Sequence, residues 1–174
     1  MASAALLARA VTVRDARPAD LGRIGEIWNP EILRTDTTTD TEPRDAAALA
    51  AWLGRHGAAW PVVVAVADDE VLAFGALSPY RPTPAFARTA EDSVYVARDR
   101  RGEGLGRRVL DELLRRAAAA GHHSVLARVT APNTASLRLH ARAGFRTVGV
   151  ERETAFKLGR WLDVVVLQRV LAGR

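Results

Sequence analysis

Three glycines at alternate positions, between a strand pattern and a helix pattern, constrain this chain more than any other feature. They lie in the segment Arg101-Gly102-Glu103-Gly104-Leu105-Gly106. Residues 93–97 before it form a short apolar strand pattern, and residues 104–120 after it repeat apolar residues at helical spacing. Glycine lets a ligand approach the backbone, and a helix start offers unpaired N–H groups and the positive end of the helix dipole. The segment therefore predicts a binding site for phosphate or pyrophosphate.

Three kinds of phosphate-binding loop compete for this segment. A P-loop requires Lys followed by Ser or Thr after its last glycine, whereas this chain has Arg107 and Arg108 there. A dinucleotide-binding fold requires Gly-x-Gly-x-x-Gly at the first strand, and here Gly-x-Gly-x-Gly follows the fourth expected strand. The pattern Arg-x-x-Gly-x-Gly is typical of acyl-CoA binding, and Arg101, Gly104 and Gly106 match it. A glycine-rich turn without a ligand is the remaining alternative.

Hydrophobic periodicity predicts an α/β domain. The expected order is strand, two helices, three strands, helix, strand, helix and two strands. Pro18 opens the first helix, and Asn29-Pro30 breaks or kinks it. The expected strands cover residues 11–14, 62–66, 71–77, 93–97, 125–129, 145–150 and 162–167, and the later helices cover residues 45–53, 104–120 and 133–143.

Length and composition fit a single globular domain. The chain has 174 residues and no cysteine, which excludes disulfides, thiolate metal sites and a cysteine nucleophile. No apolar run reaches the length of a membrane span. Residues 1–10 lack the pattern of a secretory signal, so we expect a flexible N-terminal arm before a domain at residues 11–174. The resulting expectation is a cytoplasmic protein without a membrane partner.

Positive charge is concentrated beside the glycine segment. The formal net charge is +5, and Lys157 is the one lysine among 25 basic residues. The arginines at residues 98–108 favour a local anion site over a nucleic-acid-binding face, which would need a clustered basic face with aromatic platforms. Four histidines without convergent acidic partners argue against a metal site.

With these features the chain resembles the GNAT acetyltransferase superfamily, and more closely its branch of phosphinothricin and methionine sulfoximine acetyltransferases. The resemblance spans residues 11–171 and is carried by the glycine segment and by residues 91–96 (Glu-Asp-Ser-Val-Tyr-Val), 132–140, 143–145 (Ala-Gly-Phe) and 157–163 (Lys-Leu-Gly-Arg-Trp-Leu-Asp). It implies the GNAT fold, with a central mixed, mostly antiparallel sheet flanked by helices. It also implies acetyl-CoA as cosubstrate, a small-molecule amine as acceptor and a homodimer.

The resemblance implies how the cosubstrate would bind. The backbone of residues 94–96 would pair with the pantetheine arm as an added strand does, and residues 102–107 would hold the pyrophosphate. Asn133 would contact the far part of the arm; a plain helix N-cap is its alternative role, and the two roles can coexist. The implied cofactor-binding residues are Val94, Tyr95, Val96, Arg101, Gly102, Glu103, Gly104, Leu105, Gly106, Arg107, Asn133 and Ser136.

Two titratable residues are implied as catalytic. Glu91 would take the proton of the acceptor amine, while Asp92 would face the opposite side of the strand. His140 occupies the position that would protonate the departing thiolate. The alternatives are an ordinary exposed acid for Glu91 and a packed histidine bonded to a carbonyl for His140.

The acceptor site is the least specified part of the sequence. The resemblance places it between residues 29–40 and residues 80–88. Tyr80, Phe86 and Arg88 are the implied substrate residues, and an arginine would suit the carboxylate of an amino acid. An amino acid or amino acid analogue is therefore the expected acceptor.

The chain also departs from its branch. Herbicide-detoxifying members carry an acid near the position of Leu33 and an aromatic residue near that of Thr39, and this chain has neither. Three alternatives stay open. They are an acyl-CoA-binding sensor or non-catalytic domain, an acetyltransferase for aminoglycosides, and one for peptide N-termini.

Overall fold

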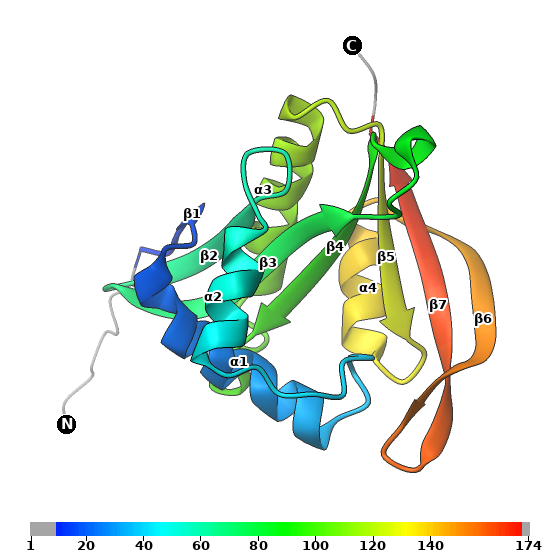
Figure 1. Cartoon of the computed structure of the whole chain (residues 1–174), viewed down its shortest axis with the longest axis horizontal. Helices are drawn as coiled ribbons and strands as arrows, with labels where there is room; N and C mark the ends of the chain where they lie inside the picture. Colours follow the sequence, from blue (N-terminus) through cyan, green and yellow to red (C-terminus); the bar gives the residue numbers. More distant parts are fainter. Residues whose placement is uncertain (1–9, 172–174) are drawn as a thin grey trace, which may run out of the picture.

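The computed structural model describes residues 10–171, which form one seven-stranded sheet with helices on both faces (Figure 1). The strands are β1 (Thr12–Asp15), β2 (Val62–Ala67), β3 (Glu70–Pro79), β4 (Thr89–Val96), β5 (Ser124–Thr130), β6 (Arg146–Lys157) and β7 (Arg160–Val170). The α-helices are α1 (Leu21–Arg34), α2 (Ala46–Gly54), α3 (Leu105–Ala119) and α4 (Thr134–Arg142), with 3-10 turns η1 (Pro18–Asp20), η2 (Pro84–Phe86) and η3 (Arg98–Arg100).

The sheet confirms the expected order of elements and the mixed, mostly antiparallel pairing. Its strand order is β1-β2-β3-β4-β5-β7-β6, and among the described strands β4 and β5 are the one parallel pair. No helix in the described part of the chain is long and apolar enough to cross a bilayer. The arm expected at residues 1–10 lies outside the described residues, except for Ala10.

Of the break or kink expected at Asn29-Pro30, the break is wrong, because α1 continues through Pro30 to Arg34. Proline costs the helix a hydrogen bond, but buried side chains on both sides of it, such as Ile27 and Ile32, hold the helix against the sheet. The Asn29 side chain fixes the segment before α2: it donates to the Arg44 carbonyl and accepts from the Arg44 amide, both at 2.9 Å.

The strands β4, β6 and β7 extend well beyond their apolar patterns. β4 begins at Thr89 rather than at residue 93. The apolar pattern does not reveal this start, because Glu91 and Asp92 are polar although they are paired with β3. β6 and β7 extend to a tight turn at Leu158-Gly159, where both residues have positive φ. Most side chains of β6 are exposed, so its hydrophobic pattern is weak.

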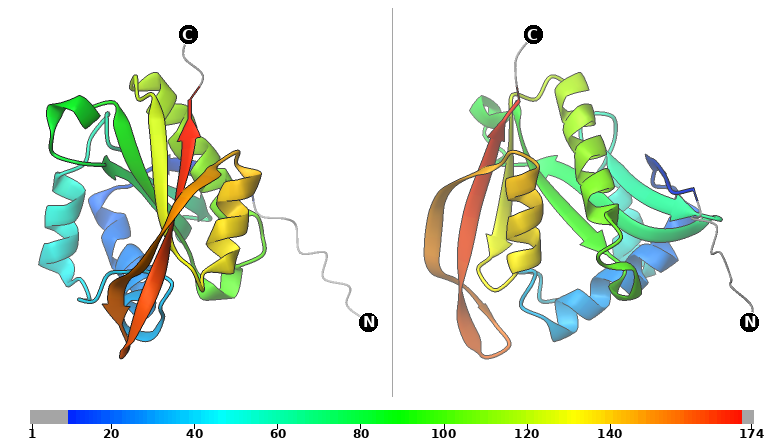
Figure 2. Two further views of the ribbon diagram at one scale, coloured as in Figure 1. Left: turned by 90° about the vertical axis from the view of Figure 1, so that its right-hand side faces the viewer. Right: turned by 180° about the vertical axis from the view of Figure 1, so that it is seen from behind.

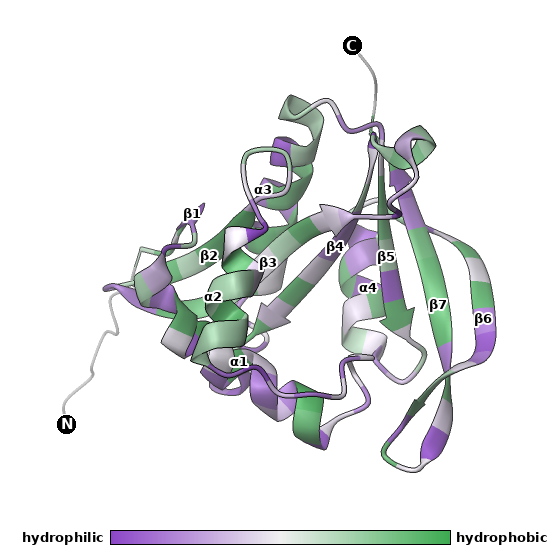
Figure 3. Cartoon of the chain, in the orientation of Figure 1, coloured by the Kyte–Doolittle hydropathy of each residue, from purple (hydrophilic) through white to green (hydrophobic). Residues whose placement is uncertain are grey.

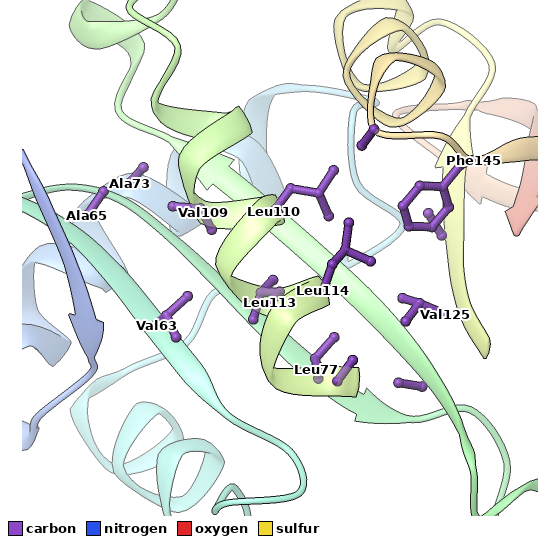
Figure 4. Close-up of a cluster of buried hydrophobic side chains, with 14 of the residues drawn as sticks. Val63, Ala65, Ala73, Leu77, Val109, Leu110, Leu113, Leu114, Val125 and Phe145 are labelled. Atoms are coloured by element: carbon purple, nitrogen blue, oxygen red, sulfur yellow. The ribbon is translucent and has the colours of Figure 1, made fainter. Parts of the chain in front are cut away.

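The two faces of the sheet carry separate cores because different helices cover them (Figures 1 and 2). In β2, Val63 and Ala65 pack with α3, whereas Val62 and Val64 pack with α1 and α2. Since both faces are covered, the whole strand is apolar. Figure 3 shows hydrophobic residues along the central strands, and Figure 4 shows the apolar stripe of α3 against its face of the sheet.

The sheet divides between β4 and β5. These strands pair at three positions, the last of which joins Glu91 to Leu126. Beyond it, β4 stays paired with β3 through Val96, and β5 stays paired with β7 through Thr130. The two strands therefore diverge as a V (Figure 1). Along the V, the β4 edge has no partner among the described strands, and an extended ligand can bind to such an edge.

Gly75 lets α3 pack closely on β3. A Cβ atom at this position would lie 2.6 Å from Val109 Cγ1, 2.8 Å from the Ser93 carbonyl oxygen and 2.9 Å from Leu113 Cδ1. Ser93 belongs to β4, so this glycine sits where β3, β4 and α3 meet. These elements carry one arm of the V and the glycine segment.

We expect Gly75→Ala to lower the free energy of unfolding by about 1–3 kcal/mol, because the added methyl group overpacks its surroundings. Urea denaturation measures the change. Gly22→Ala is the matched control, since its Cβ would meet no atom within 4 Å and alanine favours the helix α1. Equal losses of stability in the two variants would contradict the packing argument.

Candidate active site

A cleft of about 750 Å³ occupies the opening between β4 and β5. Residues 91–96 of β4 and 127–129 of β5 line it, and they include Val94, Tyr95 and Val96, whose binding of a cofactor stays a prediction. The first turn of α3 and one side of α4 complete this wall. The opposite wall comes from α1, the loop that follows it and α2.

The glycine segment closes the open end of the V. Gly102 and Gly104 have φ of 86° and 78°, a left-handed conformation that favours glycine. Gly104 is the N-cap of α3 and offers no side-chain cap, so the first N–H groups of the helix are not capped from there. A Cβ on Gly106 would lie 3.4 Å from Leu139 and 3.5 Å from Val96, so the helix start fits between β4 and α4. The segment can therefore present N–H groups to an anion in the cleft.

Two predicted residues of the segment use their side chains elsewhere. Glu103 is not among the residues that line the cleft, and its carboxylate accepts hydrogen bonds of 2.8 and 2.9 Å from Arg100. Arg107 lines the cleft, but its guanidinium donates to Asp111 and, at 2.8 Å, to the Arg142 carbonyl. Any contact of Glu103 with a cofactor stays a prediction.

Glu31 ties the glycine segment to α1. Its side chain is 4% exposed, and its Oε1 accepts from Arg98 at 2.7 Å and from Arg101 at 2.8 Å. Its Oε2 accepts from the Thr37 hydroxyl at 3.2 Å. Arg101, predicted to bind a cofactor, thus lines the cleft while paired with Glu31. One buried carboxylate joins the loops on the two walls.

The loop after α1 is held down by long-range contacts. Lys157 donates to the Thr38 carbonyl at 2.8 Å, and burial lowers the pKa of this lysine. Arg160 forms an ion pair with Asp36. The Tyr95 hydroxyl donates to the Thr38 hydroxyl at 3.2 Å. The turn between β6 and β7 and the strand β4 therefore fix this loop as a wall of the cleft.

Glu91 lies at the vertex of the V and lines the cleft. Burial raises the pKa of its carboxyl above the ordinary value, against the opposing charge of Arg128 on β5. A half-buried carboxylate in this position can accept a proton from a bound amine.

His140 lies on the other side of β4, where Asp92 is its partner. The ring is buried and its Nε2 lies 2.9 Å from Asp92 Oδ2, while Nδ1 lies 2.8 Å from the Ser136 carbonyl. The contact of Asp92 with α4 confirms that this side chain and Glu91 face opposite sides of the strand. The alternative of a histidine bonded to a carbonyl accounts for the Nδ1 contact, whereas Nε2 faces a carboxylate.

Asn133 has the N-cap role and also lines the cleft. Its Oδ1 accepts from the Ser136 amide at 3.1 Å, and its Nδ2 donates to the Thr37 carbonyl at 3.2 Å. Asn133 and Ser136 are both cleft residues, so the two roles coexist in one geometry.

The implied substrate residues do not reach the cleft. Tyr80, Phe86 and Arg88 are not among its lining residues, and the first two pack against each other with ring centroids 5.5 Å apart. Their role in acceptor binding stays a prediction. The part of the cleft that the prediction leaves to the acceptor, here called the acceptor side, is lined instead by Trp28, Thr37, Thr38, Thr39, Asp40, Arg44, Arg55, Ser78 and Arg128.

Sequence reasoning missed Glu31 and gave no partner to Asp92. The partners of Glu31 lie 67 and 70 positions later, and the partner of Asp92 lies 48 positions later. One signal was available: Glu31 follows Ile27 by four positions and Trp28 by three, so an acid occupies the apolar stripe of an amphipathic helix. Buried acids need a cationic or hydrogen-bonding partner. Among the described residues, no group of three or more His, Cys, Asp or Glu side chains could hold a metal ion.

The site's elements lie in a stretch that known proteins share. The acetyltransferase (GNAT) family model matches residues 26–145. The L-methionine sulfoximine/L-methionine sulfone acetyltransferase of Pseudomonas paraeruginosa is 39% identical over 159 residues, covering 90% of this chain and 92% of that protein. The phosphinothricin N-acetyltransferase of Streptomyces coelicolor is 39% identical over 165 residues, covering 92% and 96%. The structure of yncA, a putative acetyltransferase from Salmonella typhimurium with its cofactor acetyl-CoA, matches with a TM-score of 0.90 at 32% identity, covering 95% and 96%.

We expect Glu31→Gln to lower the free energy of unfolding by about 1–3 kcal/mol at neutral pH, because the carboxylate accepts charge-assisted hydrogen bonds. Burial opposes its charge, but Arg98 and Arg101 outweigh burial and hold the pKa of Glu31 below its ordinary value of 4.5. The stabilisation is complete above pH 4.5 and is lost as the pH falls through the lowered pKa.

Urea denaturation at neutral pH and at a series of pH values below 4.5 checks this prediction. The difference in the free energy of unfolding between wild type and Glu31→Gln should become smaller as the pH falls. Glu26→Gln on the exposed side of the same helix is the control and should change little, since exposed ion pairs contribute little. A difference in the free energy of unfolding that stays constant with pH would contradict the stabilising role given to the charge of Glu31.

Proposed function

The chain belongs to the GNAT acetyltransferase family, and on that premise we propose that it acetylates the primary amine of an amino acid or amino acid analogue. The observation that carries the proposal is the position of Glu91 at the vertex of the V. β4 runs from this vertex to the open end, where the glycine segment follows it. A carboxylate that would take the proton of the amine and a loop that would hold a pyrophosphate thus lie at the two ends of one free strand edge.

The residues present fit acetyl-CoA. Five residues of β4 beyond Glu91, at about 3.3 Å each, separate the vertex from the loop by about 16 Å, which an extended pantetheine arm can span. The free edge of residues 92–96 would bind the amides of the arm. The left-handed glycines and the start of α3 would bind the pyrophosphate.

In a direct transfer, Glu91 and His140 would have different chemical roles. Glu91 would accept the proton of the attacking amine, and its raised pKa makes it a better base than an exposed glutamate. The acetyl group would pass from the thioester to the amine nitrogen in one enzyme-bound complex. His140, on the α4 side of β4, would protonate the departing thiolate.

The charges on the acceptor side favour an acceptor with a carboxylate. Arg44, Arg55 and Arg128 line that side; Arg44 is paired with Asp40 and Arg128 with Glu151, while Arg55 has no ion pair among the described residues. An arginine that can pair with a carboxylate supports an amino acid or an analogue such as methionine sulfoximine or phosphinothricin over a polycationic aminoglycoside. The relatives named above act on such compounds.

We also infer that the domain at residues 11–174 works in the cytoplasm as a homodimer. Exposed apolar side chains on the β6–β7 hairpin, among them Val148, Phe156 and Trp161, support contact with a second copy. Proton transfer by side chains suffices for the chemistry, so we propose no metal and no nucleic-acid or membrane partner.

A thiol-release assay with acetyl-CoA tests the proposed function. The acceptors should include methionine sulfoximine, methionine sulfone, phosphinothricin, common amino acids, an aminoglycoside and short peptides. We expect turnover with amino acid analogues, because their carboxylate complements the arginines of the cleft. Turnover with the aminoglycoside or the peptides alone would contradict an amino acid acceptor and assign the acceptor to one of those classes. If no amine is turned over while acetyl-CoA still raises the melting temperature, the result would favour an acyl-CoA sensor instead.

Glu91→Gln should lower kcat by about 10²- to 10⁴-fold, because the base is lost, with little change in acetyl-CoA affinity. In the wild type, kcat/KM should fall as acid protonates Glu91, at a pH above its ordinary pKa of 4.5. Steady-state kinetics across pH and calorimetric binding of acetyl-CoA measure both effects. Glu70→Gln, at an exposed end of β3, is the control. A Glu91→Gln enzyme with wild-type kcat at every pH would refute the assignment.

A further inference from the structure

A buried histidine–carboxylate pair lies on the α4 side of β4, behind the vertex of the V. His140 Nε2 lies 2.9 Å from Asp92 Oδ2, and the two side chains are 4% and 0% exposed. The ring of Phe145 packs edge-on against His140, with ring centroids 5.0 Å apart. β4 and α4 thus enclose one acid and one base that face each other.

The contacts of the ring favour its doubly protonated form. Nδ1 lies 2.8 Å from the Ser136 carbonyl oxygen, which can only accept, and Nε2 faces the Asp92 carboxylate. A neutral imidazole has one donor and one acceptor nitrogen, so it would set a lone pair against one of these oxygens. The Ser136 hydroxyl is farther from Nδ1, at 3.2 Å. The doubly protonated ring satisfies both close contacts.

The Asp92 carboxylate is half satisfied. Its Oδ1 is buried and has no hydrogen-bond partner within the described part of the chain. A buried ion pair needs hydrogen bonds to its remaining lone pairs to offset desolvation, and an orphaned buried oxygen calls for an explanation. Oδ1 therefore keeps lone pairs that can accept a hydrogen bond from a group bound at the site.

We propose that Asp92 is the positioning residue of His140: it holds the ring doubly protonated beside the cleft, and the pair supplies the proton that the leaving thiolate of coenzyme A takes up. This inference rests on the proposed function, since it assigns the acid of that reaction. Glu91 and Asp92 are neighbours in β4 with side chains on opposite faces. The base thus acts from the acceptor side, and the pair acts from the α4 side.

The protons balance over one turnover. The acceptor ammonium loses one proton to water before attack, and its nitrogen loses a second to Glu91 in the tetrahedral intermediate. The C–S bond then breaks with its electron pair on sulfur, and the pair protonates the sulfur, which leaves Asp92 ionised and His140 neutral. The proton on Glu91, passed through water, restores the pair. The products are the amide, the free thiol and one proton in solution.

The charged group that acts on His140 is Asp92, while Ser136 contributes an uncharged hydrogen bond from α4. Burial by itself lowers the pKa of His140, but Asp92 outweighs burial and holds the pKa above its ordinary 6.5. Burial is also the main cause of the raised pKa of Glu91, against Arg128, and Asp92 adds to it. Removing the Asp92 charge should therefore lower the pKa of both His140 and Glu91.

Asp92→Asn tests the proposal because it keeps the shape of the side chain and removes its charge. We expect kcat to fall about 10²-fold, with the KM values of acetyl-CoA and acceptor little changed. The alkaline limb of kcat should move to lower pH, because a proton donor must be protonated to act. A folded Asp92→Asn enzyme with wild-type kcat and an unmoved alkaline limb would overturn the proposal.

His140→Gln provides the second arm. Its loss of kcat should match that of Asp92→Asn, and the double variant should be no slower than the slower single variant, because the two residues act as a unit. Losses that multiply in the double variant would overturn the pairing. His122→Gln is the matched control: His122 is also buried and bonds to the Ala59 carbonyl, but it does not line the cleft, so its loss should leave kcat unchanged.

Nitrogen-15 NMR of the wild-type protein with labelled histidine tests the protonation without a variant at the pair. The chain has 4 histidines, so replacing the other three identifies His140. At neutral pH both of its ring nitrogens should give imidazolium shifts. A neutral-ring pattern would overturn the proposal even if Asp92→Asn fails to fold.

The outcomes separate this proposal from the proposed function. A wild-type protein that acetylates an amine, with kcat insensitive to Asp92→Asn, would overturn the role of Asp92 alone. A wild-type protein that acetylates no amine, with His140 charged in the NMR spectrum, would overturn the proposed function and, with it, the protonation of a thiolate.

Discussion

The end of the β4–β5 pairing at Glu91 and Leu126 is the constraint on which the rest of the site depends. Two strands paired to their ends would leave neither a free edge nor a cleft. The strands β4 and β5 can diverge because β3 and β7 keep each of them hydrogen-bonded on its outer side. The same divergence lets the start of α3 and the side of α4 meet beside β4, where a Cβ on Gly106 would contact Leu139 and Val96.

Burial and charge then fix what surrounds the opening. Glu31 would be costly in an apolar helix face without partners, and Arg98 and Arg101 satisfy it from the loop before α3. Lys157, from the far end of the chain, donates to the Thr38 carbonyl on the opposite wall. Segments that are distant in sequence thus meet around one cleft through buried polar groups, each of which needs its partner.

Two adjacent carboxylates lie in different environments because a strand turns successive side chains to opposite faces. Glu91 faces the cleft beside Arg128, where burial raises its pKa. Asp92 faces α4 and pairs with His140, whose pKa it raises against burial. Separated environments of this kind let one site hold a base and an acid at the same pH.

The sequence by itself determined the order of strands and helices, the glycine segment, the cap at Asn133 and the opposite faces of Glu91 and Asp92. These follow from periodicity, backbone freedom and local hydrogen bonding, which act over a few residues. Only the tertiary structure decided that α1 passes through Pro30, that Tyr80, Phe86 and Arg88 lie off the cleft, and that Asp92 meets His140. Packing against the sheet outweighs the local cost of a proline, and the partner of a buried charge is chosen by which elements the fold brings together.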